Sequence, residues 1–189
     1  MKERRARESI ETYISEVGNL LEELSAQDIA QIVAVLDETR QAGGRVFVFG
    51  NGGSAATASH FASDLAKGAI CEGKRRMRAF ALTDNVPLLS AWANDCDYAS
   101  VFAEQLEGFI EEDDVAIGIS GSGNSQNVLD GIRLAREKGA TTIGFIGFGG
   151  GRLKDIVDLC VIVGSHDMRQ VEDLHLLLTH ALTTCLAEG

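Results

Sequence analysis

The chain has 189 residues, of which 45% are hydrophobic and 24% charged, a composition that supports the core of one domain and excludes a disordered chain. Its formal net charge of −11 repels nucleic acid and anionic membranes, so we expect it to bind neither. An anionic substrate is repelled as well, and would need a local pocket of hydrogen-bond donors instead of a basic face.

The cysteines and the first residues predict a cytoplasmic protein. Four cysteines (Cys71, Cys96, Cys160 and Cys185) form no CxxC pair, which favours reduced thiols over a disulfide or zinc-finger framework. The sequence begins with a charged segment that has no apolar signal core. No window reaches the ~18 apolar residues of a membrane span.

The first 42 residues are expected to form two helices. Apolar side chains recur at helical spacing over residues 10–24, which predicts the first helix. Ser25 with Asp28 resembles a capping box that opens a second helix. Gly43-Gly44 ends this helix after about residue 41.

From residue 45 on, short apolar strands alternate with helices. We expect strands at residues 45–49, 77–82, 114–119, 141–148 and 159–163, and helices at residues 55–67, from near Pro87, at 127–138 and at 171–186. Strands that are apolar throughout indicate a parallel sheet covered on both faces. The predicted fold class is therefore α/β, with a five-stranded parallel sheet sandwiched by helices. Ligands of such sheets bind beyond the carboxyl ends of the strands, at a topological switch point.

Three of these strand ends carry glycine-rich loops, GNGGS, SGSGNS and GFGGG, and the first two are expected to bind a phosphate. Gly50–Ser54 lies between a strand and a helix, where glycines let the backbone approach a ligand and the helix presents free amides. Ser120–Ser125 has the same position after another strand and adds three serine hydroxyls. Two such loops can surround one phosphate without a lysine or arginine. The alternative is two unrelated turns whose serines are ordinary helix caps.

A dinucleotide-binding site is a competing interpretation of the first loop. GNGGSA matches G-x-G-x-x-A, a weak fingerprint, and Asp84 is the acid that would bind a ribose. This interpretation does not explain the SGSGNS loop, and Asp84 lies farther downstream than the usual ~20 residues. A dinucleotide-dependent oxidoreductase therefore stays as an alternative.

Two helices carry candidate acid–base residues. His60 and Asp64 are four residues apart and share one face of the helix after the first loop, with about two turns, or ~9 Å, between the loop and the pair. The last helix carries Glu172, His175 and His180. The two histidines are about 140° apart around the helix, so they cannot both point into one small site. Geometry alone does not choose between them.

Four segments together resemble the SIS (sugar isomerase) domain family, and within it the phosphoheptose isomerase type. They are GNGGSAATASHFASDL, LTDNVPLLSAWANDCDY, ISGSGNSQNVLDGIRLAREKGATTIGF and EDLHLLLTH, and the similarity covers nearly the whole chain. The resemblance implies a single SIS domain over residues 1–189, with a flavodoxin-like core at 43–189. It also implies that the helices at 1–42 serve to build a homotetramer.

The resemblance implies phosphate contacts from Ser54, Ser120, Ser122 and Ser125, with Gly121 in place of the family's usual threonine. Further substrate contacts are expected from Asn51, Gly52, Gly53, Gly121, Asp84, Asn94, Asp95 and Glu172. For Asp84, Asn94 and Asp95, which would bind sugar hydroxyls, the alternative is helix capping.

The resemblance also implies a metal site. In the family a His, a Glu four residues later, a Gln, and a His eight residues after that Gln gather around zinc. The matching positions are His60, Asp64, Glu172 and His180, so Asp replaces Glu and Glu replaces Gln. The shorter Asp64 withdraws its carboxylate by ~1.5 Å, a distance that matters for proton transfer. Two histidines and two carboxylates suit Zn²⁺ or another divalent ion.

The family counterparts assign catalytic roles, with Asp64 as the base and His180 as the acid. The implied reaction converts sedoheptulose 7-phosphate to D-glycero-D-manno-heptose 7-phosphate through an enediol. The alternative is a non-catalytic, phosphosugar-binding SIS protein, such as a tetrameric regulator of a bacterial replication initiator. That regulator lacks the carboxylate and the terminal histidine, so Asp64 and His180 favour an enzyme.

Overall fold

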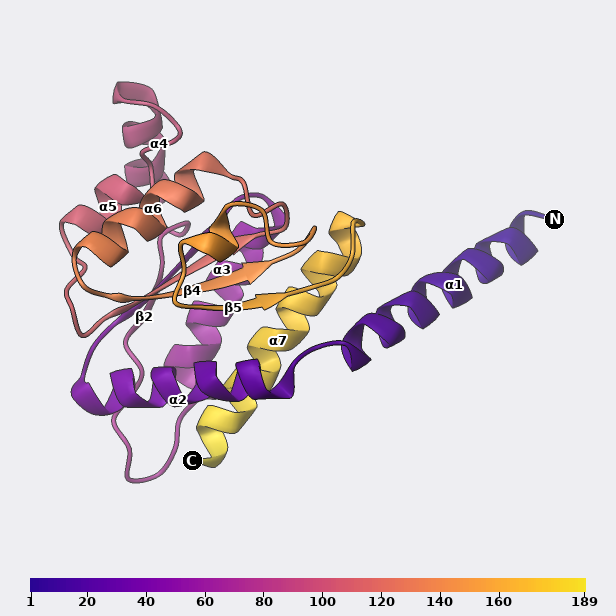
Figure 1. Ribbon diagram of the computed structural model, residues 1–189, viewed down its shortest axis with the longest axis horizontal. Helices are drawn as coiled ribbons and strands as arrows, with labels where there is room; N and C mark the ends of the chain where they lie inside the picture. The colour runs from indigo at the N-terminus through magenta and orange to yellow at the C-terminus, as the bar shows by residue number, and fades with distance from the viewer.

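The computed structural model describes residues 1–189 and contains a parallel five-stranded sheet with helices on both faces (Figure 1). The strands are β1 (Val46–Gly50), β2 (Ala79–Ala81), β3 (Val115–Ser120), β4 (Thr141–Ile146) and β5 (Leu159–Ile162). Their order across the sheet is β2-β1-β3-β4-β5, and all neighbours are parallel. The predicted fold class is confirmed, and the strand order is the flavodoxin-like one.

The helices lie close to the predicted positions. They are α1 (Lys2–Glu22), α2 (Ala26–Ala42), α3 (Gly53–Ser63), α4 (Val86–Asp95), α5 (Ala103–Glu107), α6 (Gln126–Glu137) and α7 (Met168–Glu188). Directly after α3 the chain continues as a π-helical turn, η1 (Asp64–Gly68), and a 3₁₀ turn, η2 (Leu153–Asp155), precedes β5. The sequence analysis did not predict α5 or either turn.

Alternating side chains of the strands build two cores, one on each face of the sheet. In β1, Val46 and Val48 face the core covered by α2, α3 and α7, whereas Phe47 and Phe49 face the core covered by α5 and α6. Both faces are apolar because both are covered, which is why the strand segments read as apolar throughout.

The strand order reverses between β1 and β3, since the chain leaves β1 toward β2 on one side and returns to β3 on the other. This is the topological switch point at which ligands of such sheets bind. The loops after β1 and β3 are the two serine- and glycine-rich segments.

An ion pair stabilises the sheet at the amino-terminal ends of its strands, opposite the switch point. Asp114, just before β3, is 2% exposed and accepts a hydrogen bond from the backbone N–H of Arg45 at 2.7 Å. The Arg45 guanidinium also pairs with it, with Nη2 2.8 Å from Oδ2. This pair fixes the amino ends of β1 and β3, far from the switch point.

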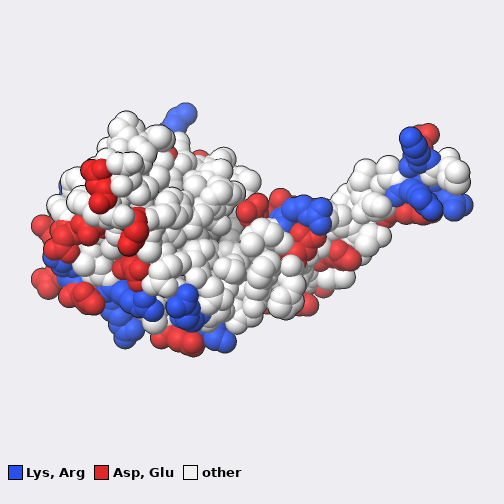
Figure 2. Space-filling view, turned by 90° about the horizontal axis from the view of Figure 1, so that it is seen from above, with Lys and Arg blue, Asp and Glu red and all other residues white.

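The two N-terminal helices differ in how they pack. Ser25 accepts a hydrogen bond from the backbone N–H of Asp28, as its predicted role as a cap requires, and Gly43 ends α2 with φ of 84°. Within α2, Ile32 and Leu36 are fully buried in the core shared with α3 and α7. In contrast, α1 has no buried residue and extends away from the body of the protein (Figures 1 and 2).

The surface of α1 carries charges of both signs, as Figure 2 shows. The second half of α1 contacts the body. Val17, Leu20 and Leu21 pack against Val163, just after β5, and against Val171 and Leu174 of α7. The Tyr13 hydroxyl also donates to the Asp173 carboxylate at 2.6 Å. No helix in the structure combines the length and the apolar character that crossing a membrane requires.

Candidate active site

Two helix N-termini open at the switch point without side-chain caps. Gly52 is the N-cap of α3, and Ser125 is the N-cap of α6, yet neither accepts a hydrogen bond on a side chain from the first turn. By comparison, α2, α4 and α7 each have a capping side chain. Free N–H groups and the positive end of the helix dipole make an anion site. The serines of the second loop are therefore not acting as ordinary caps.

A pocket of about 240 Å³ lies between the two loops. It is lined by nine residues expected to contact substrate, namely Asn51, Gly52, Gly53, Ser54, Ser120, Gly121, Ser122, Ser125 and Glu172, together with Ile119 and Met168. No lysine or arginine lines it. The sequence analysis expected a pocket of neutral donors for an anion, and the structure brings those residues together, with the Glu172 carboxylate as the one charged group of the lining.

Two side chains that the sequence analysis missed hold the first loop in place. Asn51 and the buried Asn127 exchange amide hydrogen bonds of 2.8 and 2.9 Å, which tie the first loop to the start of α6. The Tyr98 hydroxyl donates to Asn51 Oδ1 at 2.9 Å. The only signal for Asn127 was its place just after the SGSGNS loop, and Tyr98 had none.

The third glycine-rich loop supports the second one instead of lining the pocket. The backbone N–H of Gly147 donates to the Gly121 carbonyl at 3.0 Å, and that of Leu153 donates to the Gly123 carbonyl at 2.9 Å. Gly123 has φ of 64°, and a Cβ there would lie 2.1 Å from the Gly150 carbonyl oxygen. Only glycine allows the two loops to approach this closely.

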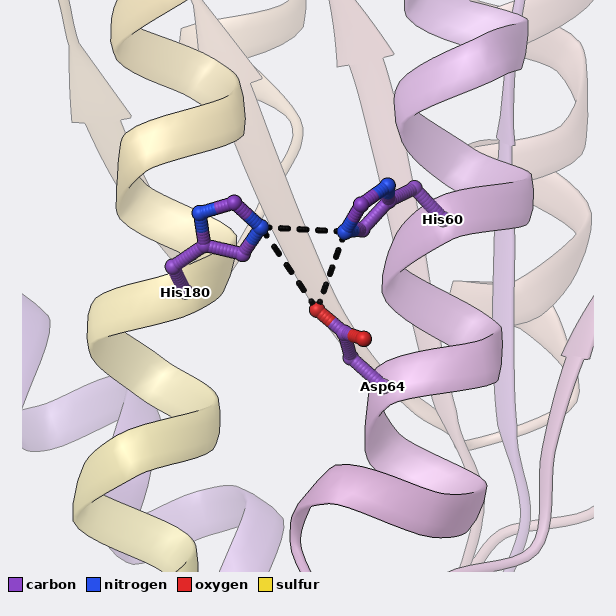
Figure 3. A group of neighbouring side chains, drawn as sticks. All are labelled: His60, Asp64 and His180. Carbon is purple, nitrogen blue, oxygen red and sulfur yellow. Dashed lines mark hydrogen bonds and ion pairs between the residues drawn. The ribbon is translucent and has the colours of Figure 1, made fainter.

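His60, Asp64 and His180 form a cluster between α3 and α7 (Figure 3). The two Nε2 atoms of the histidines are 2.9 Å apart, and Asp64 Oδ2 lies 3.2 Å from His60 Nε2 and 3.7 Å from His180 Nε2. The histidine side chains are about half exposed, at 47% and 52%, so a ligand can reach all three groups.

The backbone changes at Asp64, where α3 becomes the π turn. The Asp64 carbonyl accepts a hydrogen bond from the N–H of Ala69 at 2.9 Å, five residues later. Single π turns inside helices frequently occur at functional sites, because the extra residue re-aims the side chains around it.

The structure separates the two histidines of α7, as their spacing predicts. His175 is 1% exposed and packs against the ring of Phe145, with the centroids 6.2 Å apart. Burial lowers its pKa to about 4, so His175 is neutral at physiological pH. His180 is the one that faces the site.

Glu172 lies at the pocket and outside the histidine–aspartate cluster. A Cβ built on Gly53 would lie 2.4 Å from its carboxylate atoms, so the carboxylate rests against the start of α3. The structure thus places Glu172 at the lining of the pocket, whereas the ligand atoms of His60, Asp64 and His180 lie within 4.8 Å of one another.

Three predicted sugar-binding residues lie outside the pocket lining. Asp84 accepts a hydrogen bond from the Ser59 hydroxyl, next to His60 on α3. Asn94 donates to Asp95 at 2.8 Å, and both are exposed at the end of α4.

The fold, with its pocket at the switch point and its cluster on the helices that leave the pocket, defines an α/β domain of the SIS type. The SIS domain family matches residues 12–147. The chain is 38% identical over 182 residues to a phosphoheptose isomerase of Aquifex aeolicus, which covers 96% of this chain and 92% of that protein. It is 40% identical over 165 residues to one of Geobacter sulfurreducens, covering 87% of each.

Among solved structures, a phosphoheptose isomerase from Neisseria gonorrhoeae superimposes with a TM-score of 0.89 at 28% identity, covering 98% of both chains. Another from Francisella tularensis gives a TM-score of 0.90 at 26% identity over both whole chains. The chain therefore belongs to the SIS domain family and, within it, to the phosphoheptose isomerases.

The position of Glu172 yields a prediction for the isosteric variant Glu172→Gln. Removing a negative charge from the pocket lining should strengthen binding of inorganic phosphate several-fold, since a charge a few ångströms from an anion contributes about 1 kcal/mol even when well solvated. Calorimetric titration with phosphate measures the effect. Met168→Leu, a neutral change in the same lining, should leave the affinity unchanged, and weaker binding by Glu172→Gln would contradict the prediction.

Proposed function

We propose that this enzyme converts sedoheptulose 7-phosphate to D-glycero-D-manno-heptose 7-phosphate, with the phosphate in the pocket between the two loops and the reacting carbons at the His60, Asp64 and His180 cluster. One observation carries the proposal. Two helix N-termini without side-chain caps share a pocket that no lysine or arginine lines. One of these helices, α3, leads directly to the group of His60, Asp64 and His180.

The phosphate is bound by neutral donors. It accepts hydrogen bonds from the first backbone amides of α3 and α6 and from the hydroxyls of Ser54, Ser120, Ser122 and Ser125. The net charge of −11 disfavours an anion elsewhere on the surface, so these local donors give selectivity. Binding energy at the phosphate then positions the other end of the sugar.

The helices α3 and α7 set the distance between the phosphate pocket and the reacting carbons. Both α3 and α7 begin at the pocket, because Gly53 and Met168 line it, and they pack side by side. His60 lies six residues beyond Ser54, about 9 Å along α3 at ~1.5 Å per residue. This span suits the far end of an extended seven-carbon sugar.

The reaction moves a proton from C1 of the ketose to C2 and changes which oxygen forms the carbonyl. Asp64 takes the C1 proton and returns it to C2, with a neutral enediol between the two steps. His180 donates a proton to the carbonyl oxygen at C2 as the first step proceeds. It recovers a proton from the C1 hydroxyl as the aldehyde forms. Atoms and charge balance without a co-reactant.

The role assignment predicts the effect of Asp64→Asn and His180→Asn. Each removes one proton-transfer group while keeping a similar size, so each should lower kcat at least ~100-fold. Binding of inorganic phosphate should change less than twofold, because the pocket lies at the other end of the helices. Turnover of sedoheptulose 7-phosphate and calorimetry measure both quantities.

His166→Asn is the matched control, since His166 is exposed before α7 and lies outside the cluster. It should keep wild-type turnover. Near-native turnover of Asp64→Asn and His180→Asn would end the role assignment, and a wild-type protein with no turnover would end the proposed function itself.

The cluster also fits a divalent metal such as zinc. A tetrahedral zinc with ligands at about 2.05 Å has edges of about 3.3 Å between ligand atoms. The three edges here are 2.9, 3.2 and 3.7 Å and join two imidazole nitrogens and a carboxylate oxygen. His60, Asp64 and His180 would hold the ion. The ion would occupy His180 Nε2, so when bound it would polarise the sugar carbonyl as a Lewis acid in place of the proton that His180 donates in the metal-free enzyme.

Metal binding is tested by removing a ligand that has no assigned proton-transfer role. His60→Asn should lower the affinity for Zn²⁺ at least tenfold, as measured by competition with a chromogenic chelator. His166→Asn should bind as the wild type does. Equal Zn²⁺ affinity of His60→Asn and wild type would contradict a site at this cluster.

We also propose that α1 joins subunits of a homotetramer. Ile10 and Ile14 are 58% and 64% exposed on the projecting part of α1, and burying such side chains is favourable by ~1.5–3 kcal/mol each. Four unpaired cysteines are compatible with the predicted cytoplasmic location.

Replacing both isoleucines by glutamate should dissociate the assembly, because two charges per subunit would then enter the interface. Sedimentation velocity should show a tetramer for the wild type and a smaller species for Ile10→Glu/Ile14→Glu. Ser9→Glu/Thr12→Glu adds the same charge to other exposed positions of α1 and should remain tetrameric. A wild-type monomer would overturn this proposal.

A further inference from the structure

Arg40, near the end of α2, is among the largest fully buried side chains of the protein. Its Nη1 donates two hydrogen bonds, to the Ala69 carbonyl at 3.2 Å and to the Leu186 carbonyl at 3.1 Å. Ala69 directly follows η1, and Leu186 lies in the last turn of α7. A single guanidinium therefore connects the ends of the two helices that carry His60, Asp64 and His180.

The buried charge of Arg40 is balanced locally. Asp37, one turn earlier, forms an ion pair with it. Burial alone would raise the pKa of the Asp37 carboxyl, but hydrogen bonds from Arg40, Gln41 and Lys74 outweigh burial and lower it. Two helix carboxyl ends, each with a partial negative charge, also face the guanidinium.

The contacts of Arg40 are selective. Its Nε has no hydrogen-bond partner, although an unpaired buried donor costs ~1–3 kcal/mol. The guanidinium is thus oriented toward the two carbonyls and Asp37, and the carbonyls belong to segments 117 residues apart in the sequence. Figure 1 shows α2 crossing both helices near these ends.

The two carbonyls that Arg40 binds lie close to the cluster of His60, Asp64 and His180. Ala69 follows Asp64 by five residues, and Leu186 follows His180 by six, about 8–9 Å along each helix. Between these carbonyls and the cluster, η1 and α7 are in contact, since a Cβ on Gly68 would lie 2.9 Å from the Thr183 methyl. A change in separation at Arg40 would therefore move His180 relative to Asp64.

We propose that Arg40 is a positioning residue, which sets the separation of α7 from α3 and η1 and so places His180 against His60 and Asp64. The catalytic part of this inference rests on the proposed isomerase function. Misplacing a reacting group by ~1 Å can lower turnover about 100-fold, so the position of α7 matters for kcat. The phosphate pocket, at the other end of the helices, should be unaffected.

Arg45 provides a matched control. Like Arg40, it forms an ion pair with an aspartate, here the buried Asp114. This pair lies at the amino-terminal ends of the strands, opposite the pocket. Arg40→Met and Arg45→Met should both lower the melting temperature. If Arg40 positions the cluster, only Arg40→Met should also lower kcat and shift the histidine signals.

The experiment compares Arg40→Met, Arg40→Lys and Arg45→Met by turnover of sedoheptulose 7-phosphate, at a temperature at which each is folded. Arg40→Met should lower kcat at least tenfold with KM changed less than twofold. Arg40→Lys, which keeps the charge and can donate to the carbonyls, should recover part of kcat. Arg45→Met should keep wild-type kcat and KM.

A second measurement does not need the reaction. In metal-free protein, the ring NMR signals of His60 and His180 should shift in Arg40→Met and stay in place in Arg45→Met, while His166 serves as an internal reference. If the wild type has no turnover, the proposed function fails, and this measurement alone still decides whether Arg40 positions the cluster.

Wild-type kcat and unshifted His60 and His180 signals in a destabilised Arg40→Met would show that Arg40 only stabilises the fold, and would overturn the proposal. If Arg40→Met does not fold, Arg40→Lys decides by the same criteria. A lower kcat with shifted histidine signals supports positioning, and wild-type values in both overturn it.

Discussion

The proposed phosphate site depends on the free N–H groups at the point where the sheet reverses its strand order. The helices α3 and α6 both begin there, and no side chain caps either one. Gly52, Gly53 and Gln126 are exposed, so a ligand with several acceptor oxygens can reach these N–H groups and the positive ends of both helix dipoles. This is why a pocket without lysine or arginine, on a protein of charge −11, suits a phosphate.

Two helices connect the pocket to the proposed acid–base cluster. A helix rises ~1.5 Å per residue and is stiff over a few turns, so residue counts fix distances more firmly than loops do. His60 on α3 and His180 on α7 lie at set distances from Ser54 and Glu172, which line the pocket. On the proposed function, the distance between the pocket and the cluster would select for the length of the sugar chain.

Much of this arrangement could be predicted from the sequence, and the failures have physical causes. Apolar periodicity predicted every strand, and two loops of one composition at two strand ends predicted the pocket. Periodicity does not reveal α5, which has only five residues, or the contacts of Asn127 and Tyr98, which join distant segments. The burial of Arg40 cannot be predicted from the sequence pattern either, because its partners are the backbone carbonyls of distant residues. By its pattern it is one more charged residue of an amphipathic helix.

The shorter acid at position 64 illustrates how these parts fit together. Family resemblance implies a glutamate there, and aspartate withdraws the carboxylate by ~1.5 Å. Asp64 nevertheless lies 3.2 Å from His60 and 3.7 Å from His180. The contact with His180 depends on how closely η1 and α7 approach each other. Gly68 leaves no side chain between η1 and Thr183, and Arg40 donates to one carbonyl beyond each of the two segments, one to two turns past the cluster.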